Sequence, residues 1–263
     1  MRIQRLSTAS YKFFSPRGKI VMVDPWLTQD PLWPLAEKTP EKLKEIEAVA
    51  ITHAHFDHSA GIEEIVKQNE SVFIIAQYEY ALSLMARGIK NVIPAGIGAT
   101  VEFQGIKFSM VSASHTSSEM VQDGKTEFAG TAVGYVIEFE NGKKVYVSGD
   151  TGLTADMKFV VSDFFKPHIS ILPVCGLFMM EPEQAAYAAN AIGSRWVIPC
   201  HDFPKEVSEA ADPEGYREFL EQYPVQDLYK KVEKFMEIMK RDYPHIETVY
   251  IPIGGSASFE ESI

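Results

Sequence analysis

Residues 52–58, Thr-His-Ala-His-Phe-Asp-His, place three imidazoles and one carboxylate within a single short stretch. These are side chains that borderline divalent metal ions favour in proteins. In extended backbone, residues two apart point to the same side, so His53 and His55 are expected to converge on one ion. Asp57 and His58 follow where the chain turns toward a helix, and they are expected to face a second point. The stretch therefore predicts a metal site, and a histidine-rich surface loop is the less favoured interpretation.

The residues on either side of this stretch predict short strands and helices. Residues 48–52 form an apolar strand that runs into the cluster, and Ile62, Ile65 and Val66 recur at helical spacing after it. Residues 25–40 are apolar but contain four prolines, which excludes a regular helix there. The other elements expected in the first half are strands at 2–6, 11–14, 19–23 and 71–76 and a helix at 77–87.

Two hairpins are expected in the middle of the chain. One turns at Gln104–Gly105 and the other at Asn141–Gly142, a pair that tolerates positive φ. Their strands are expected at 101–103, 107–111, 134–139 and 143–148. The polar segment 116–130 lies between the hairpins, has no periodicity and is expected to be a surface loop. The second half predicts strands at 169–173, 196–200 and 248–253, a helix at 182–192 and an amphipathic helical stripe over 228–239.

The mixture of strands and helices predicts one domain covering residues 1–263, with an α+β fold. Hairpins in both halves indicate two packed mixed sheets, and the amphipathic helices are expected to cover them from outside, which gives a four-layer αββα sandwich. No stretch of linker composition divides the chain.

Three further residues of metal-ligand type each follow a predicted strand. They are His115 after 107–111, Asp150 after 143–147 and His201 after 196–200. Each alone has an ordinary interpretation, because histidines occur in polar loops and aspartate is common in turns such as Gly149–Gly152. Their combination with residues 52–58 favours a shared site.

In this combination the sequence resembles the metallo-β-lactamase superfamily, whose HxHxDH signature matches residues 53–58 and whose pattern extends from Asp24 to His201. The resemblance implies an αββα fold and two divalent metal ions. It implies that one ion is bound by His53, His55 and His115, that the other is bound by Asp57, His58 and His201, and that Asp150 bridges them. A water or hydroxide between the ions would be the nucleophile, since bound divalent metals acidify water.

The resemblance also implies roles for two aspartates near the metals. Asp57 would orient the hydroxide, so Asp57 and Asp150 are the expected catalytic residues. Asp24 matches an early aspartate of the family and is expected to support the ligands from outside, with a plain Asp-Pro turn as an equally good interpretation.

Three stretches narrow the resemblance to a bacterial group of metal-dependent hydrolases that includes L-ascorbate 6-phosphate lactonase. They are residues 20–27 (IVMVDPWL), 149–158 and 166–186. The chain departs from that group at His168, where the group often has aspartate, and near Thr8 and Ala9, where it often has a His-Ser pair. We therefore expect His168 to be structural, and we assign no role borrowed from the missing histidine.

The composition restricts the partners. The net charge is −11 and the pI is about 5.2, so the surface repels phosphate backbones and anionic membranes. No apolar run reaches membrane-span length and no signal peptide precedes the first strand, so a cytoplasmic protein is expected. The expected partner is a small-molecule substrate, without nucleic acid or membrane, and nothing indicates an oligomer. Cys175 and Cys200 are expected to stay reduced.

The leading functional hypothesis is a metal-dependent hydrolase that uses a metal-bound hydroxide to cleave a small ester, lactone, amide or phosphoester. One alternative is a non-hydrolytic, iron-dependent oxidoreductase on the same fold. Another is a phosphodiesterase or nuclease, which the charge of −11 disfavours. Zinc and manganese are the expected ions, and iron and nickel stay open because nitrogen and oxygen ligands accept all four.

Several large or charged residues near the ligand segments have two interpretations. One interpretation is that they form the apolar wall of a substrate pocket, and the preferred interpretation is that they cover the ends of the sheets. These residues are Trp26, Trp33, Phe178, Met179 and Met180. The surface loop 116–130 is also a candidate for a lid over the site. Lys125 in that segment is expected to be a solvated lysine rather than an anion contact.

Overall fold

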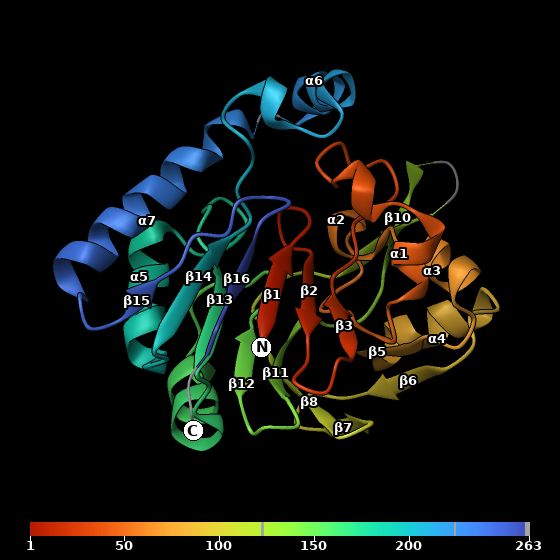
Figure 1. The fold of residues 1–263 in the computed structure, drawn as a ribbon, viewed down its shortest axis with the longest axis horizontal. Helices are drawn as coiled ribbons and strands as arrows, with labels where there is room; N and C mark the ends of the chain where they lie inside the picture. Colours follow the sequence, from red (N-terminus) through yellow and green to blue (C-terminus); the bar gives the residue numbers. More distant parts are fainter. Residues whose placement is uncertain (122–123, 224, 261–263) are drawn as a thin grey trace.

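The computed structural model describes residues 1–121, 124–223 and 225–260. Two seven-stranded sheets pack face to face, and helices cover the outer side of each sheet, so four layers follow one another across Figure 1. The expected αββα sandwich is therefore confirmed. Among the described helices, none is both long and apolar enough to cross a bilayer.

The first sheet is antiparallel at one side and parallel at the other. Its strand order is β16 (Ser256–Ser258), β1 (Arg2–Arg5), β2 (Tyr11–Phe14), β3 (Ile20–Val23), β4 (Ala48–Ala50), β5 (Phe73–Gln77) and β6 (Val92–Ala95). Strands β3 to β6 run parallel to one another. Its outer face carries α1 (Pro40–Lys44), α3 (Ile62–Gln68) and α4 (Tyr78–Ala86). The four-residue helix α2 (Phe56–Ser59) follows β4 and carries part of the ligand stretch.

The second sheet is mixed in the same way. Its order is β15 (Glu247–Thr248), β14 (Trp196–Cys200), β13 (Ile169–Pro173), β12 (Lys144–Val147), β11 (Val133–Glu138), β8 (Ile106–Ser112) and β7 (Thr100–Phe103). Strands β12 to β15 are parallel, and the rest are antiparallel. Its outer face carries α5 (Pro182–Ile192), α7 (Tyr229–Asp242) and the π-helical segment Met157–Phe165.

The core follows from the two-residue period of the strands. In β3, Val21 and Val23 point between the sheets, whereas Met22 packs under the outer helices. In β11, Tyr135 and Ile137 face the first sheet while Val136 faces α5 and α7. The central strands thus bury both faces, which explains their nearly continuous apolar runs in the sequence.

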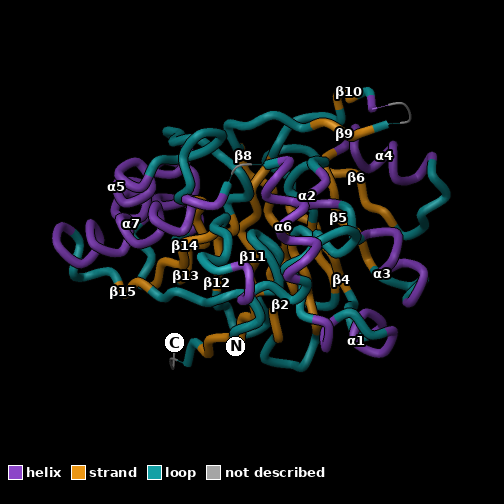
Figure 2. Tube along the Cα trace, turned by 90° about the horizontal axis from the view of Figure 1, so that it is seen from above, coloured by secondary structure: helices purple, strands orange, loops and turns teal. Residues whose placement is uncertain are grey.

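Two expectations need correction, and the absence of a regular helix between residues 25 and 39 is confirmed. Residues 116–130 are not a plain loop, because β9 (Ser118–Met120) and β10 (Thr126–Phe128) pair as a hairpin that projects from the body in Figure 2; residues 122–123 lie outside the described part. The predicted strand 248–253 ends at Thr248, and Pro252 beyond it lacks an amide donor. In segment 25–40 the chain makes one 3-10 turn, Leu35–Glu37.

Candidate metal centre

Four strand ends bring the ligand residues to one edge of the sandwich. His53 follows β4 of the first sheet, and His115, Asp150 and His201 follow β8, β12 and β14 of the second. The two sheets touch closely here, because Gly149 packs on Thr52. A Cβ at position 149 would lie 2.7 Å from the Cβ of Thr52, and the backbone there has φ +59°, so only glycine fits without strain.

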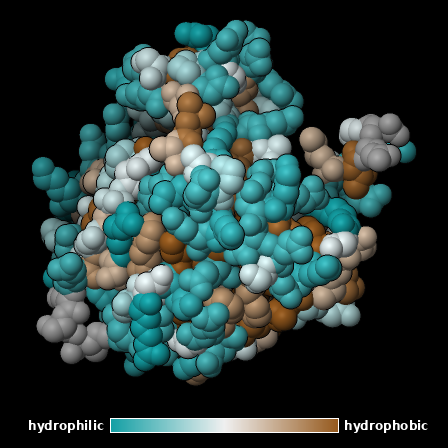
Figure 3. Space-filling model, turned by 45° about the vertical axis from the view of Figure 1, so that its right-hand side comes forward, coloured by the Kyte–Doolittle hydropathy of each residue, from teal (hydrophilic) through white to brown (hydrophobic). Residues whose placement is uncertain are grey.

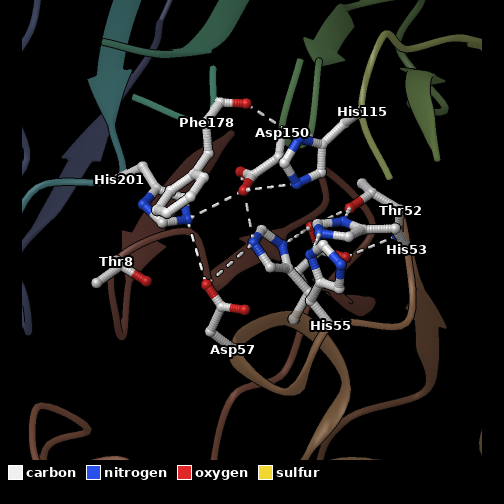
Figure 4. Close-up of polar contacts among 12 residues, drawn as sticks. Thr8, Thr52, His53, His55, Asp57, His115, Asp150, Phe178 and His201 are labelled. Atoms are coloured by element: carbon white, nitrogen blue, oxygen red, sulfur yellow. Dashed lines mark hydrogen bonds and ion pairs between the residues drawn. The ribbon is translucent and has the colours of Figure 1, made fainter. Parts of the chain in front are cut away.

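All seven predicted site residues come together in two groups. His53, His55 and His115 form the first group, and Asp57, His58, Asp150 and His201 form the second; within each group the ligand-type atoms lie within 4.8 Å of one another. Asp150 contacts both groups, with its oxygens 3.4 Å from His58 Nε2, 3.3 Å from His201 Nε2 and 3.7 Å from His115 Nε2. Figure 4 shows the side chains converging on this carboxylate.

The second group has unsatisfied polar atoms that fit a cation. His58 Nε2, His201 Nε2 and Asp150 Oδ1 are buried without a hydrogen-bond partner. The Nε2 atoms of His58 and His201 lie 3.4 and 3.3 Å from the carboxylate of Asp150. Buried polar atoms are rarely left unpaired, since each costs about 1–3 kcal/mol. Imidazole nitrogens and carboxylates around a shared point are a donor set for divalent metals, so these residues suit such an ion.

Outer hydrogen bonds fix which nitrogen of two histidines faces the group. His58 Nδ1 lies 2.9 Å from Asp24 Oδ2, and His115 Nδ1 lies 3.1 Å from the carbonyl of Phe178. Both oxygens accept, so each Nδ1 carries a proton, and each Nε2 is the nitrogen aimed at the cluster, where its lone pair becomes available to an ion once the imidazole is neutral. Asp24 also accepts from the Thr52 amide and hydroxyl, each at 2.7 Å. The supporting role expected for Asp24 has this structural basis.

Replacing Asp24 by asparagine is expected to weaken metal binding at the second group about 10- to 100-fold. The two oxygens of Asp24 receive three hydrogens, from the Thr52 amide, the Thr52 hydroxyl and His58, and an amide NH2 in place of either oxygen must face a donor. Competition with a chromogenic chelator measures the affinity. An unchanged affinity in Asp24→Asn would contradict the role, and Asp163→Asn, at an exposed carboxylate, is the control.

The electrostatics of the two groups differ. Burial opposes a charge on His58, but Asp150, Asp57 and Asp24 outweigh it and raise the pKa of His58 to about 10. Burial also opposes a charge on His201, and Asp150 again outweighs it and raises that pKa. In the first group burial dominates and lowers the pKa of His53, His55 and His115. The metal-free second group therefore holds protons near neutral pH, whereas the first group presents neutral imidazoles.

Metal binding to the second group is expected to release protons from His58 and His201. The apparent affinity should therefore rise with pH until about pH 10, where His58 is already deprotonated. Calorimetry in two buffers of different ionisation enthalpy counts the protons released per ion. Release of more than one proton at pH 7 is expected at the second group, and release of none would contradict the charge state described here.

The raised pKa of His58 also predicts how the stability of the metal-free protein depends on pH, and this trend is opposite to that of the metal affinity. The pKa of His58 is raised above its usual 6.5, so its charged form stabilises the folded protein fully below that value. That contribution is lost as the pH rises through about 10. Metal-free protein should therefore lose stability toward alkaline pH by this term while its affinity for metal increases.

His201 is held in an unusual backbone conformation that the sequence did not predict. Its φ is +70°, which is rare for a residue with a side chain. Its amide donates to the Thr8 carbonyl at 2.9 Å, and the thiol of Cys175 contacts its carbonyl oxygen. Strained backbone of this kind persists where the surroundings fix it from several sides.

A buried ion pair next to His201 supplies part of that support. Arg5 Nη2 lies 2.7 Å from Asp202 Oδ1, with the side chains 0% and 4% exposed. Arg5 also donates to the carbonyls of Thr8 at 2.8 Å and Asp202 at 3.2 Å. The Tyr250 hydroxyl donates to Asp202 Oδ2 at 2.7 Å. Because Arg5 and Asp202 are 197 residues apart, no spacing in the sequence linked them.

The remaining candidates divide as follows. Trp26, Trp33 and Met180 are buried, as cover for the sheet ends would be, and Trp26 also lines a cavity. Phe178 is 65% exposed and lies beside His201 and Asp150 in Figure 4. His168 accepts from the Lys144 amide at 3.0 Å, away from the cluster, as expected for a structural residue. Lys125 is exposed on the hairpin.

Comparisons with known proteins bear on the same residues. The family described as "Beta-lactamase superfamily domain" matches residues 19–201. A UPF0173 metal-dependent hydrolase from Methanosphaera stadtmanae is 38% identical over 206 residues, which cover 76% of this chain and 83% of the relative. One from Rubrobacter xylanophilus is 34% identical over 203 residues, which cover 76% and 81%.

Solved structures share the architecture. Igni18, a metallo hydrolase from Ignicoccus hospitalis, superposes with a TM-score of 0.72 at 24% identity and 99% coverage of both chains. A possible metal-dependent hydrolase from Veillonella parvula superposes at 0.70 and 20%, covering 98% of this chain and 99% of the other. At these identities the likeness concerns the fold.

Proposed function

Since the chain belongs to the metallo-β-lactamase superfamily and is a metal-dependent hydrolase, we propose that it cleaves a small ester, lactone, amide or phosphoester at a two-metal centre. The observation that carries this proposal is the position of Asp150. Its carboxylate lies between the three-histidine group and the second group, within 3.7 Å of imidazole nitrogens from both.

In this proposal His53, His55 and His115 would hold one ion, Asp57, His58 and His201 would hold the other, and Asp150 would contribute to both. Divalent ions supply a water that is deprotonated near neutral pH and positive charge for the oxyanion of the cleaved group. The fit of the second group rests on its unpartnered nitrogens and on the outer hydrogen bonds that aim them.

Asp57 is proposed to orient the attacking water. Its side chain is 20% exposed, compared with 5% for Asp150, so it is the carboxylate of the cluster that solvent and substrate reach. Burial opposes its charge, but His58 and His201 outweigh it and hold the pKa of Asp57 well below its usual range. Asp57 therefore stays an acceptor for a water proton at every pH near neutrality.

We further propose that the substrate is a soluble small molecule in the cytoplasm. The two cysteines are buried and unbridged, which suits a reducing compartment. The net charge of −11 works against nucleic acid as a substrate.

The first experiment is elemental analysis of gently purified protein, with metal counted per chain. About two equivalents of zinc or manganese, as a two-metal site requires, followed by turnover of a member of a panel of esters, lactones, amides and phosphodiesters, are the expected results. Mainly iron would favour the oxidoreductase alternative. No metal, and none bound on reconstitution, would overturn the proposal.

A further inference from the structure

A cavity of about 540 Å³ lies between α2, the loop after Trp26 and the helix α6 (Pro213–Gln222). Helix α6 lies above α2 in Figure 1, and in Figure 2, seen from above, the two helices lie next to each other. Figure 3 shows the surface hollowed beneath the upper lobe, with apolar side chains visible there. The volume is in the range of small-molecule sites, which is about 300–1,000 Å³.

Aromatic residues connect the wall of this cavity to the metal ligands at two places. Phe56 lines the cavity and stands between His55 and Asp57 in the first turn of α2. On the other side, Phe219 lines the cavity and stacks on Phe203 at 5.6 Å between ring centroids, and Phe203 lies 6.4 Å from the ring of His201. Two aromatic rings, Phe219 and Phe203, therefore separate a group in the cavity from His201, and Phe56 alone separates it from the neighbouring residues of the ligand stretch.

The side of the cavity nearest the metals is aromatic. The Tyr223 ring lies 5.8 Å from Phe56 and 4.9 Å from Phe219, and the buried Trp26 ring lies 5.5 Å from Phe219. Phe56, Phe219 and Tyr223 are only partly buried, so their rings have surface to offer a ligand. Such rings bind apolar and aromatic groups, and their faces attract cations.

The charged residues of the cavity make it unfavourable for anions. Among the described lining residues, Asp30, Asp212 and Glu218 are acidic and Lys38 is basic, and Lys38 donates to the Asp30 carbonyl at 2.9 Å. A smaller cavity of about 240 Å³ shares Phe56 with it and adds two glutamates and one arginine. Burial raises the pKa of Asp30 to about 7, so Asp212 and Glu218 carry most of the negative charge of the lining, which repels anionic substrates.

We propose that this cavity binds the large apolar group, preferably an aromatic ring, of an ester, lactone or amide substrate that carries no negative charge. The scissile bond then lies over His55 and Asp57, on either side of Phe56. This inference rests on the proposed function and narrows its substrate class. Of the esters, lactones, amides and phosphoesters proposed above, the acidic lining disfavours the phosphoesters.

The first test uses two inert probes of matched shape, benzyltrimethylammonium and phenylmethanesulfonate, with the metal-loaded protein. Saturation-transfer NMR and calorimetry measure their affinities. Phe219→Ala is expected to weaken binding of the cationic probe about tenfold, as for loss of a pocket wall. Phe164→Ala, which removes a 75% exposed ring from the π-helical segment, should leave it unchanged. Equal affinity in wild type and Phe219→Ala would overturn the proposal.

A charge reversal tests the acidic lining. Glu218→Lys should strengthen binding of the sulfonate and weaken that of the ammonium, each roughly two- to fivefold, as expected for exposed charges. Glu214→Lys is the matched control, because Glu214 is exposed on the same helix outside the lining and the change in net charge is identical. The same shift in both variants would show a general field effect and would overturn the acidic-lining argument.

The kinetic test compares methyl phenylacetate, methyl acetate and methyl 4-sulfophenylacetate, which share one scissile bond. The phenylacetate is expected to have the highest kcat/KM, by about tenfold, and Phe219→Ala should remove that preference while metal content stays constant. Ester cleavage without dependence on Phe219 contradicts the cavity proposal alone. Binding of the ammonium probe through Phe219, without turnover of any ester, lactone, amide or phosphoester, contradicts the proposed function alone.

Discussion

Alanine at position 150 is expected to remove metal from both groups and to lower hydrolysis by on the order of 10³. The Asp150 carboxylate is the negative charge that imidazoles of both groups share, at 3.3–3.7 Å. Without it, each ion loses a ligand and the neutralising charge that compensates the cost of burying a cation. Elemental analysis after dialysis should find far less than the two equivalents per chain expected for wild type.

Lys125→Ala is the control for this result. Lys125 is an exposed residue of the hairpin, and its removal should leave metal content and activity at the wild-type level. Full retention of both ions by Asp150→Ala would exclude the bridging role. Loss of one ion with retention of the other would assign Asp150 to a single group.

The second large effect is expected from Asp202→Ala. Removing this carboxylate leaves Arg5 charged and buried, which costs about 3–5 kcal/mol of folding free energy. The loop that holds His201 in its left-handed conformation also loses an anchor. Denaturant unfolding in the presence of chelator measures the first effect. The loss of the anchor should appear as a 10- to 100-fold lower metal affinity of the second group, with the affinity of the three-histidine group unchanged.

Tyr250→Phe separates the ion pair from general disturbance of this region. It removes one hydrogen bond to Asp202 and keeps the Arg5 contact, so a loss of about 1 kcal/mol is expected. Equal loss of both ions in Asp202→Ala would mean that the pair supports the whole fold rather than His201.

The ligand set was predictable because its signals are local. Residues 53–58 are close in sequence, and His115, Asp150 and His201 each follow an apolar run that forms a strand. Strand ends of like direction meet at one edge of a sheet, and the resemblance to the metallo-β-lactamase superfamily assigned these residues to one site. The Asn141–Gly142 turn between β11 and β12 was predictable for the same reason.

The parts that the sequence did not predict depend on distant contacts. The Arg5–Asp202 pair joins β1 to the residue after His201, and no local pattern marks a buried arginine. Helix α6 was missed, and the aromatic wall it forms with Phe56 exists only in the folded chain. The hairpin of β9 and β10 is built from polar and exposed residues without the alternation that indicates a half-buried strand.

The Gly149–Thr52 contact lies where the two halves of the sandwich meet, and each ligand group draws members from both halves. His53 and His55 belong to the first sheet's side and His115 to the second; Asp57 and His58 likewise stand opposite Asp150 and His201. A bound ion would therefore link the two halves of the sandwich, and its binding free energy would add to the stability of the folded protein. Cellular metal supply would then govern how long the protein survives proteolysis as well as how fast it works.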